Sequence, residues 1–321
     1  MQKSWQYLFG PVPSRRLGRS LGVDLIPLKT CTMDCIFCQL GRTPKTTVQR
    51  AEYVPIEKVL GELEEWISEG GRADHITLAG SGEPTLHVEF GEVFRWVKNH
   101  TKIPTVLLTN GSLLYLPEVR RDAAFANKVK ITMSAWDEES FQKMHRAHAG
   151  ISFERLMEGE EKFSAEYNGE LSVEVFLVEG VNTSEESLRK MAERVATLKP
   201  DRIDLNTAIR PAAESSVRAI SLQKMKEIAA LFGEKAVVSA SYPAEGEGRG
   251  RSAPSSQTLL DLLARHPATL EQLALDFSTS QKELLPHLTK LLQQKKIAVE
   301  IRDKETYYLS RQHLEKKDFQ K

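Results

Sequence analysis

Residues 30–38 read Thr30-Cys31-Thr32-Met33-Asp34-Cys35-Ile36-Phe37-Cys38 and hold the only three cysteines of the chain. Three residues separate the first pair of cysteines and two separate the second pair. Thiolates are the usual ligands of iron–sulfur clusters, and three on one short loop can bind three irons of a [4Fe–4S] cube. The fourth iron then has no cysteine. Because an open iron is reactive, the stretch predicts a chemically active cluster at Cys31, Cys35 and Cys38.

Two other interpretations of these cysteines exist. A structural zinc site needs four ligands, usually from two paired motifs, and the sequence has no second cysteine pair. His145 or His148 could supply a fourth ligand, although both follow more than 100 residues later. Three buried cysteines with a purely structural role are a poor explanation for three thiols within eight residues that also include Asp34.

The cysteine loop lies near the start of a region, residues 20 to about 210, in which short β-rich runs alternate with helical patterns. In residues 56–67, for example, apolar side chains recur at 56, 59, 60, 63, 66 and 67, which is helical spacing. Alternating strands and helices form βαβ units and a parallel sheet with right-handed crossovers. We therefore predict an α/β fold, a partial (β/α)6 barrel with its chemistry at the carboxyl ends of the strands. The six expected strands span 21–26, 75–79, 105–109, 129–133, 171–178 and 202–206.

The composition changes at residues 243–256, which are rich in Gly, Pro and charge and are expected to be a linker. It would separate a barrel domain, residues 1–242, from a small domain, residues 257–321. Helical patterns over 257–265, over 270–277 with Thr269 as N-cap, and from 280 through Leu292 precede β-rich runs at 297–301 and 306–309. Three helices followed by a hairpin predict a winged helix-turn-helix domain. Pro286 is expected to kink its third helix.

The spacing Cys-x3-Cys-x2-Cys, with Phe37 before the last cysteine, resembles the radical S-adenosylmethionine (SAM) superfamily. A second segment, Ala79-Gly80-Ser81-Gly82-Glu83-Pro84-Thr85, follows an expected strand and is similar to the "GGE" segment of that superfamily. It departs from the pattern in having Ser81 between the glycines, as some members do. Glycines let the backbone approach a ligand closely, and Glu83 offers an acceptor for an ammonium group. An ordinary turn after a strand would also contain Gly and Pro.

The resemblance implies an enzyme with two cofactors, a [4Fe–4S] cluster and SAM, and an electron donor such as flavodoxin or ferredoxin. The amine and carboxylate of SAM would chelate the open iron, and one electron would cleave SAM to a 5′-deoxyadenosyl radical that abstracts hydrogen from a substrate. The protein would supply orientation and shielding. Asp137 is an additional ribose or carboxylate candidate, and Arg210 is a candidate clamp for the SAM carboxylate or an anionic substrate group. The residues expected to bind SAM are Phe37, Gly80, Gly82, Glu83, Asn110, Ser134, Asn206 and Arg210.

The N-terminal segment from Phe9 to Ser20, together with the cysteine loop and residues 39–43, resembles a subgroup of "Fe–S oxidoreductases". These enzymes are grouped with those of wybutosine-tRNA and molybdenum-cofactor biosynthesis. Within this segment, Arg15, Arg16 and Arg19 could bind a phosphate or carboxylate of the substrate, or could form ion pairs that close the edge of the barrel.

The overall charge gives no hint of a nucleic-acid or membrane partner, because 44 Lys and Arg balance 44 Asp and Glu. No apolar run approaches the roughly 20 residues that span a bilayer, and clustered, unpaired cysteines favour a reducing cytoplasm. Residues 257–321 carry eleven Lys and Arg against nine Asp and Glu, a weak footprint for nucleic acid. Nucleic acid therefore remains one possible partner of the winged helix, beside a protein contact or a structural role.

Three functions compete. The first is a radical SAM enzyme acting on an unidentified RNA, peptide or small molecule. The second is an iron–sulfur redox sensor that regulates DNA through its winged helix, and a zinc-binding scaffold is third. The segment from Gly80 to Glu83 favours the enzyme, because a sensor has no need of a site for the SAM amine.

Overall fold

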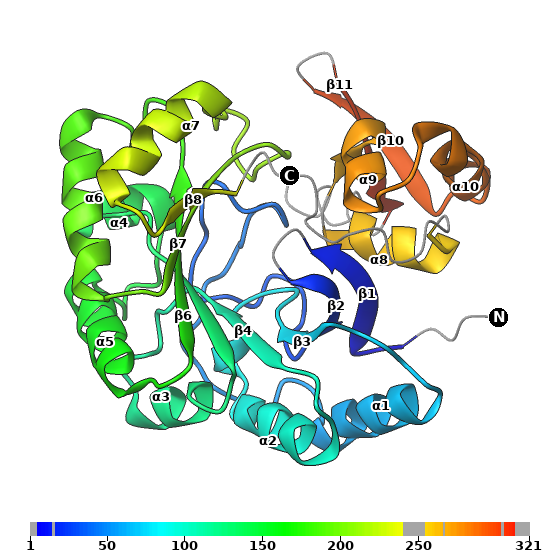
Figure 1. Ribbon diagram of the computed structural model, residues 1–321, viewed down its shortest axis with the longest axis horizontal. Coiled ribbons are helices and arrows are strands. Elements are labelled where there is room, and N and C mark those ends of the chain that lie inside the picture. The colour runs from blue at the N-terminus through cyan, green and yellow to red at the C-terminus, as the bar shows by residue number, and fades with distance from the viewer. Residues whose placement is uncertain (1–4, 15–16, 240–253, 266, 303–304, 312–321) are drawn as a thin grey trace.

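The computed structural model describes residues 5–14, 17–239, 254–265, 267–302 and 305–311 (Figure 1). One sheet of eight strands, in the order β1 to β8, organises most of them. Strand β1 pairs antiparallel with β2, and every later neighbour pairs parallel. The strands are β1 Leu8–Ser14, β2 Gly18–Val23, β3 His75–Leu78, β4 Thr105–Thr109, β5 Lys128–Thr132, β6 Glu170–Leu177, β7 Arg202–Thr207 and β8 Ala236–Val238.

The predicted α/β class and partial barrel are confirmed, and the six expected strands are β2 to β7 in sequence order. The sheet extends beyond them at both edges. Strand β1 escaped prediction because its sequence contains Gly10, Pro11 and Pro13, which disfavour a strand but are tolerated at a sheet edge. Strand β8 has only three residues, too few for a recognisable pattern.

Helices cover one face of the curved sheet, which forms the inner wall in Figure 1. The chain returns through a helix after most strands, as parallel pairing requires. Short 3-10 turns, Pro84–Leu86 and Ala230–Phe232, complete the connections. The helices are α1 Ile56–Ser68, α2 Phe90–His100, α3 Pro117–Ala123, α4 Glu138–His145, α5 Phe153–Glu166, α6 Glu185–Thr197 and α7 Leu222–Ala229.

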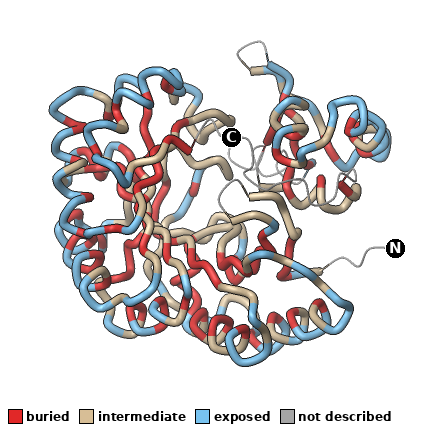
Figure 2. Tube along the Cα trace, viewed as in Figure 1, coloured by how far each residue is buried: buried red, intermediate tan, exposed pale blue. Residues whose placement is uncertain are grey.

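The core lies between the sheet and its helices, where Figure 2 shows the buried positions. Fully buried side chains such as Phe94 and Leu107 fill the half formed by the earlier strands, and Phe141, Val175 and Met191 fill the later half. Residues that alternate with these core positions point to the other face of each strand. The inner face of the later strands is therefore polar.

Three side chains show this polar inner face. Lys130 of β5 forms an ion pair with Glu174 of β6 at 2.8 Å. The amide of Asn206 in β7 donates to the same Glu174 oxygen at 3.4 Å. Lys130 and Glu174 are mostly shielded, with 17% and 14% of their side chains exposed.

The C-terminal residues form a separate small core around Leu263, Leu273 and Leu288. Their three-stranded sheet has the order β10, β11, β9. The expected helices and hairpin strands are present within one or two residues at most ends, and strand β9 is an unexpected addition. The elements are α8 Ser256–Arg265, β9 Ala268–Thr269, α9 Leu270–Asp276, α10 Gln281–Gln293, β10 Ile297–Arg302 and β11 Glu305–Ser310.

Two local predictions in this unit can be compared with the structure. Thr269 caps α9 as expected, and with Gln272 it forms a reciprocal capping box. Helix α10 continues through Pro286, and the kink expected there stays a prediction. Most of the expected linker, residues 243–256, lies outside the described residues. Among those described, no helix combines the length and apolar character that crossing a membrane requires.

Candidate cluster and cofactor site

The cysteine loop follows β2 and is fixed by its backbone to the end of α4. The N–H of Asp34 donates to the carbonyl of His145 at 2.9 Å, and that of Ile36 donates to Met144 at 3.0 Å. The N–H of Cys38 returns to the carbonyl of Cys35 at 3.1 Å, which closes a tight turn. The loop between the cysteines thus has a defined path, although it contains no helix or strand.

The three thiols lie close enough to influence one another. Burial, and then the charges of Cys31 and Cys38, hold the pKa of Cys35 well above its ordinary value. Burial, followed by the charge of Glu83, raises the pKa of Cys31 to about 12. A metal replaces the proton of such a thiol because its charge stabilises the thiolate. Three clustered thiols of this kind fit an iron–sulfur cluster, for which thiolates are the natural donors.

The arrangement differs from a site for one ion. Within the described residues, no three His, Cys, Asp or Glu side chains are placed to hold a single metal ion. In a cube, by contrast, each thiolate binds a different iron, so the sulfur atoms stand further apart than around one zinc.

Each thiol has a nitrogen atom as its neighbour, and the three nitrogens come from different parts of the chain. Burial lowers the pKa of His145 to about 4, so its ring is neutral near pH 7 and donates through only one nitrogen. Such contacts to sulfur are among the factors that set the potential of a cluster. The distances are 3.6 Å from Asn110 Nδ2 to Cys31 Sγ, 3.2 Å from His145 Nδ1 to Cys35 Sγ, and 3.4 Å from Lys29 Nζ to Cys38 Sγ.

The segment from Gly80 to Glu83 packs directly on the cysteine loop. The N–H of Glu83 donates to the carbonyl of Thr30 at 3.1 Å, and the carbonyl of Ser81 accepts from Lys29 N–H at 2.7 Å. A Cβ on Gly82 would lie 1.8 Å from the Thr30 oxygen. Gly80 has φ +133°, a conformation that side chains disfavour. These glycines therefore allow close contact between two protein segments, a role separate from the ligand approach expected of them.

The carboxylate of Glu83 is fully engaged within the protein. One oxygen accepts from Thr85 N–H, the Thr85 hydroxyl and the Thr109 hydroxyl, at 3.1, 2.6 and 2.7 Å. The other accepts the backbone N–H of Asn110 at 2.8 Å. Burial raises the pKa of Glu83 although these bonds favour its charged form. Glu83 thus joins the glycine segment to the end of β4.

Three other residues expected to bind SAM lie at or near the carboxyl ends of β4, β5 and β7, and each also contacts protein. The amide of Asn110 donates to Thr32 Oγ1 of the cysteine loop at 2.8 Å. Ser134 is buried, and its hydroxyl accepts the backbone N–H of Phe176 at 2.9 Å. Asn206 bonds to Glu174 on the inner face. The structure therefore brings Asn110 to the cysteine loop and gives Ser134 a contact between strands.

Phe37 lies in a small apolar cluster beside the cysteines. Its ring stacks on Phe176 with 4.3 Å between centroids and meets the His145 ring in a T-shaped arrangement with 5.5 Å between centroids. Ile36 and Met144 complete the surroundings. One face of the Phe37 ring is thus already covered by protein.

The arginines predicted from the sequence have different locations. Arg210 pairs with Asp276 of the C-terminal unit at 2.6 Å. Arg19 lies near the amino end of β2, away from the cysteine loop that follows the carboxyl end, and its side chain pairs with Asp74 at 3.6 Å. The structure does not bring Arg19 to the cysteines. Arg15 and Arg16 lie outside the described residues.

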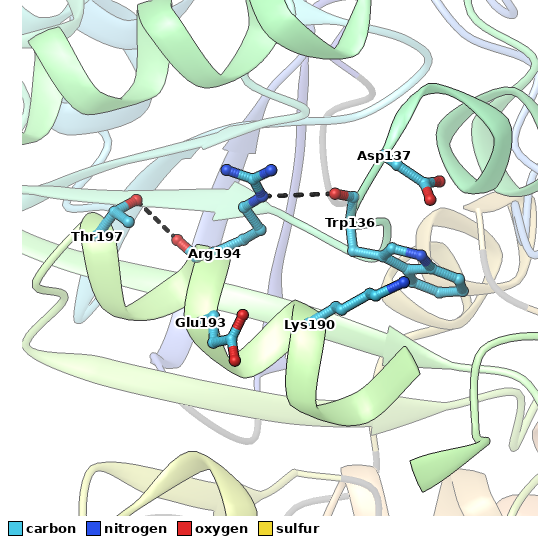
Figure 3. Close-up of a pocket in the computed structure, with 6 residues that line it drawn as sticks. All are labelled: Trp136, Asp137, Lys190, Glu193, Arg194 and Thr197. Atoms are coloured by element: carbon cyan, nitrogen blue, oxygen red, sulfur yellow. Dashed lines mark hydrogen bonds between the residues drawn. The ribbon is translucent and has the colours of Figure 1, made fainter. Parts of the chain in front are cut away.

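Asp137 lies away from the cysteines and caps α4. Its carboxylate accepts the N–H of Ser140 at 2.8 Å. It also lines a shallow surface pocket with Trp136 and residues of α6 (Figure 3). Figure 3 shows Arg194 of α6 reaching the carbonyl of Trp136, a contact of 3.4 Å. None of the three cysteines lines this pocket.

Sequence reasoning did not identify the acidic side chains that hold the site together. Asp34 is 5% exposed and accepts from Arg42 Nε at 2.7 Å and from Thr43 N–H at 2.6 Å. Asp24, after β2, accepts two bonds from Ser81. The only signal for Asp34 was its location between two cysteines, and nothing in the local sequence distinguished Asp24.

Comparison with known proteins gives one family match and several relatives. The family model described as "Radical SAM superfamily" matches residues 25–195, which include the cysteines and Gly80 to Glu83. A Brachyspira hyodysenteriae protein described as "GTPase Obg" is 33% identical over 92% of this chain and 44% of its own length. A UPF0026 protein of Methanocaldococcus jannaschii is 35% identical over 70% of this chain and 71% of its own.

A solved structure of low sequence identity shows the same fold. A radical SAM methyltransferase from Sphaerobacter thermophilus superposes with a TM-score of 0.53 and 16% identity, covering 69% of this chain and 66% of that one. The chain spans less than half of the first relative named above, so the activity of that whole protein is not transferred to it.

Proposed function

The chain belongs to the radical SAM superfamily and is an enzyme that uses a [4Fe–4S] cluster and SAM; on this premise we propose that Cys31, Cys35 and Cys38 bind the cluster. When bound, the cluster and SAM supply one-electron cleavage of the sulfonium C–S bond and hence a radical that removes hydrogen from a substrate. The observation that carries the assignment is the convergence of three mutually interacting thiols, each with a nitrogen neighbour, on the segment from Gly80 to Glu83.

The residues of the chain hold and shield this site. Glu83 fixes the backbone of its own segment against β4 through its bonds to Thr85, Thr109 and Asn110, and so holds the segment in place beside the cysteine loop. The ring of Phe37, backed by Phe176, excludes water beside the cysteines and offers an apolar surface for adenine. Asn110 orients the loop through Thr32. The polar inner face with Lys130, Glu174 and Asn206 borders the space in which a polar substrate would bind.

The C-terminal unit is proposed to be a winged helix-turn-helix domain that presents substrate RNA to the barrel. Its third helix, α10, lies on the side of the unit away from the eight-stranded sheet of the barrel (Figure 1). Lys282 and Lys290 of α10 are exposed, where they could contact phosphate. The small net positive charge of the unit matches a weak contact that recruits substrate rather than one that reads a sequence tightly.

The enzyme assignment is tested by anaerobic reconstitution. The protein should bind about four irons and four sulfides, and with dithionite and SAM it should release 5′-deoxyadenosine. A reconstituted and reducible cluster that never cleaves SAM would overturn the assignment. Cys38→Ala should prevent release of the nucleoside, whereas the exposed Lys45→Ala is a matched control nearby in the chain.

The RNA role is tested separately with the variant Lys282→Glu/Lys290→Glu. It should keep SAM cleavage without substrate and lose turnover on bulk tRNA supplied as the probe. A redox-sensing regulator is the alternative function, and it predicts DNA binding that changes with cluster oxidation and is indifferent to SAM. Binding of that kind, without SAM cleavage, would favour the regulator.

A further inference from the structure

Helix α8 of the C-terminal unit contacts the barrel at its first two strands. The carboxylate of Asp261 accepts the backbone N–H of Gly10 at 3.2 Å. The guanidinium of Arg265 lies over the ring of Phe9, 3.6 Å from its centroid. That ring occupies the space of a missing side chain, because a Cβ on Gly22 would lie 2.0 Å from it. Figure 1 shows α8 beside β1.

The same arginine reaches the glycine segment through one intermediate. Arg265 Nη2 donates to Asp24 Oδ2 at 3.3 Å. Asp24 in turn accepts the Ser81 hydroxyl at 2.5 Å and the Ser81 N–H at 3.1 Å. Asp24 also packs on Gly80, where a Cβ would lie 2.5 Å from its carboxyl carbon. The path from the C-terminal unit to the segment from Gly80 to Glu83 therefore consists of two consecutive polar contacts.

A second contact holds the unit at the other side of the barrel. Arg210, after β7, pairs with Asp276 of α9 at 2.6 Å, with 12% and 5% of the side chains exposed. The amide of Gln272 donates to the carbonyl of Ile209 at 2.8 Å. The unit thus binds residues that follow β2 and β7, and both locations are at the edge of the sheet that carries the site.

The contact between Arg265 and Asp24 is shielded from water, with 20% and 12% of the two side chains exposed. Shielding strengthens the attraction and makes the loss of one partner costly, since the other charge stays in place without compensation. Without Arg265, the Asp24 carboxylate would lack its cation while still fixed to Ser81. Its position, and with it that of Ser81, would then be less well defined.

We propose that Arg265 is a positioning residue for SAM: through Asp24 it fixes Ser81 and so the glycine segment, which makes the C-terminal unit part of the SAM site. This inference rests on the proposed function of that segment. It implies that the unit does more than recruit substrate, because SAM binding itself depends on α8.

The test compares Arg265→Gln with Arg302→Gln in the full-length reconstituted enzyme. Arg302 is a matched control, since it lies in the same unit but pairs with Glu300 of its own hairpin. The readouts are iron content, the equilibrium dissociation constant for SAM, and the change in the EPR spectrum of the reduced cluster on adding SAM. We expect Arg265→Gln to keep its iron and bind SAM roughly fivefold to tenfold more weakly. Arg302→Gln should match the wild type, and Arg265→Lys should recover part of the affinity.

The outcomes separate the two proposals. If the wild type does not bind SAM, the proposed function fails. If the wild type binds and Arg265→Gln binds equally well, only the positioning role fails. If Arg265→Gln loses its cluster, the test uses three other variants instead: Arg265→Lys, Ser81→Ala, and the double variant Arg265→Lys/Ser81→Ala. If the losses of SAM affinity in the two single variants add in the double variant, the inference is overturned. If the double variant binds SAM as tightly as Ser81→Ala alone, the inference is supported.

Discussion

The Nδ1 atom of His145 lies 3.2 Å from the sulfur of Cys35, although 110 positions separate the two residues. His145 ends α4, and its backbone carbonyl also accepts the N–H of Asp34. The end of one helix therefore fixes both the backbone of the cysteine loop and one of its sulfurs. In the tautomer with hydrogen on Nδ1, the ring donates to that sulfur.

Replacing His145 with Leu should lower the reduction potential of the cluster. A donated hydrogen bond stabilises the reduced, more negative cluster more than the oxidised one. A bond worth about 1 kcal/mol corresponds to a shift on the order of 40 mV for a one-electron couple. EPR-monitored redox titration measures the shift. His148→Leu is the control, because the His148 ring accepts the local N–H of Gly150. An equal shift in both variants would argue against a specific role.

Replacing Gly82 with Ala should prevent normal cluster assembly. Its new methyl group would lie 1.8 Å from the carbonyl oxygen of Thr30, so the cysteine loop must move. We expect a clear loss of bound iron after reconstitution, measured by iron and sulfide analysis. Gly61→Ala is the control: it lies within α1 with no atom near the new methyl group, and it should stabilise the protein by up to about 1 kcal/mol. Full iron content in Gly82→Ala would contradict the close packing.

Replacing Glu83 with Gln should destabilise the fold, although the two side chains have nearly the same shape. One carboxylate oxygen accepts three donors and the other accepts Asn110 N–H, so an amide NH2 group must face a donor. Such a mismatch costs about 1–3 kcal/mol, measurable by denaturant unfolding. Glu92→Gln, which removes an exposed ion pair with Arg95, should cost less than about 1 kcal/mol. Equal losses would mean that the four bonds to Glu83 add little.

Glu160→Gln should change how stability depends on pH. Glu160 is fully buried, neither of its carboxyl oxygens has a hydrogen-bond partner in the described part of the chain, and burial raises its pKa well above the ordinary value. The folded protein therefore keeps a proton that the unfolded chain loses at about pH 4.3. Protonated Glu160 therefore contributes fully to the free energy of unfolding below that pH, and this contribution is lost as the pH rises through the pKa of Glu160 in the folded protein.

The variant cannot lose this proton, so its thermal midpoint should exceed that of the wild type at pH 8 and lie closer to it at pH 5. Differential scanning calorimetry under anaerobic conditions at both pH values makes the comparison. If the thermal midpoints of the wild type and the variant change by the same amount between pH 5 and pH 8, Glu160 is not the group that makes stability depend on pH.

The sequence predicted the main architecture because the alternation of strands and helices is a local property. Apolar spacing placed α1, and β-rich runs placed strands β3 to β7 to within one residue and β2 three residues too late in the chain. The cysteine spacing together with Gly80 to Glu83 predicted the family that the comparisons confirm. Strand β1 was missed because Gly and Pro obscure its pattern. Strand β8 and the two-residue β9 are too short to be recognised.

The contacts of single side chains could not be predicted from the sequence, since they depend on partners distant along the chain. Arg210 has the residue type expected of a carboxylate clamp, and its guanidinium forms an ion pair with Asp276. Glu83 was expected to face a ligand, and its four bonds within the protein are visible only once β4 is placed beside it.

By itself, the sequence determined the βα order and the three clustered thiols, because both are written in residues close together along the chain. Only the tertiary structure decided which nitrogen faces each sulfur and that Arg265 reaches the glycine segment through Asp24. The physical reason is that hydrogen bonds and ion pairs act over a few ångströms, and only the folded chain brings together residues such as Asp24 and Arg265, which are 241 positions apart.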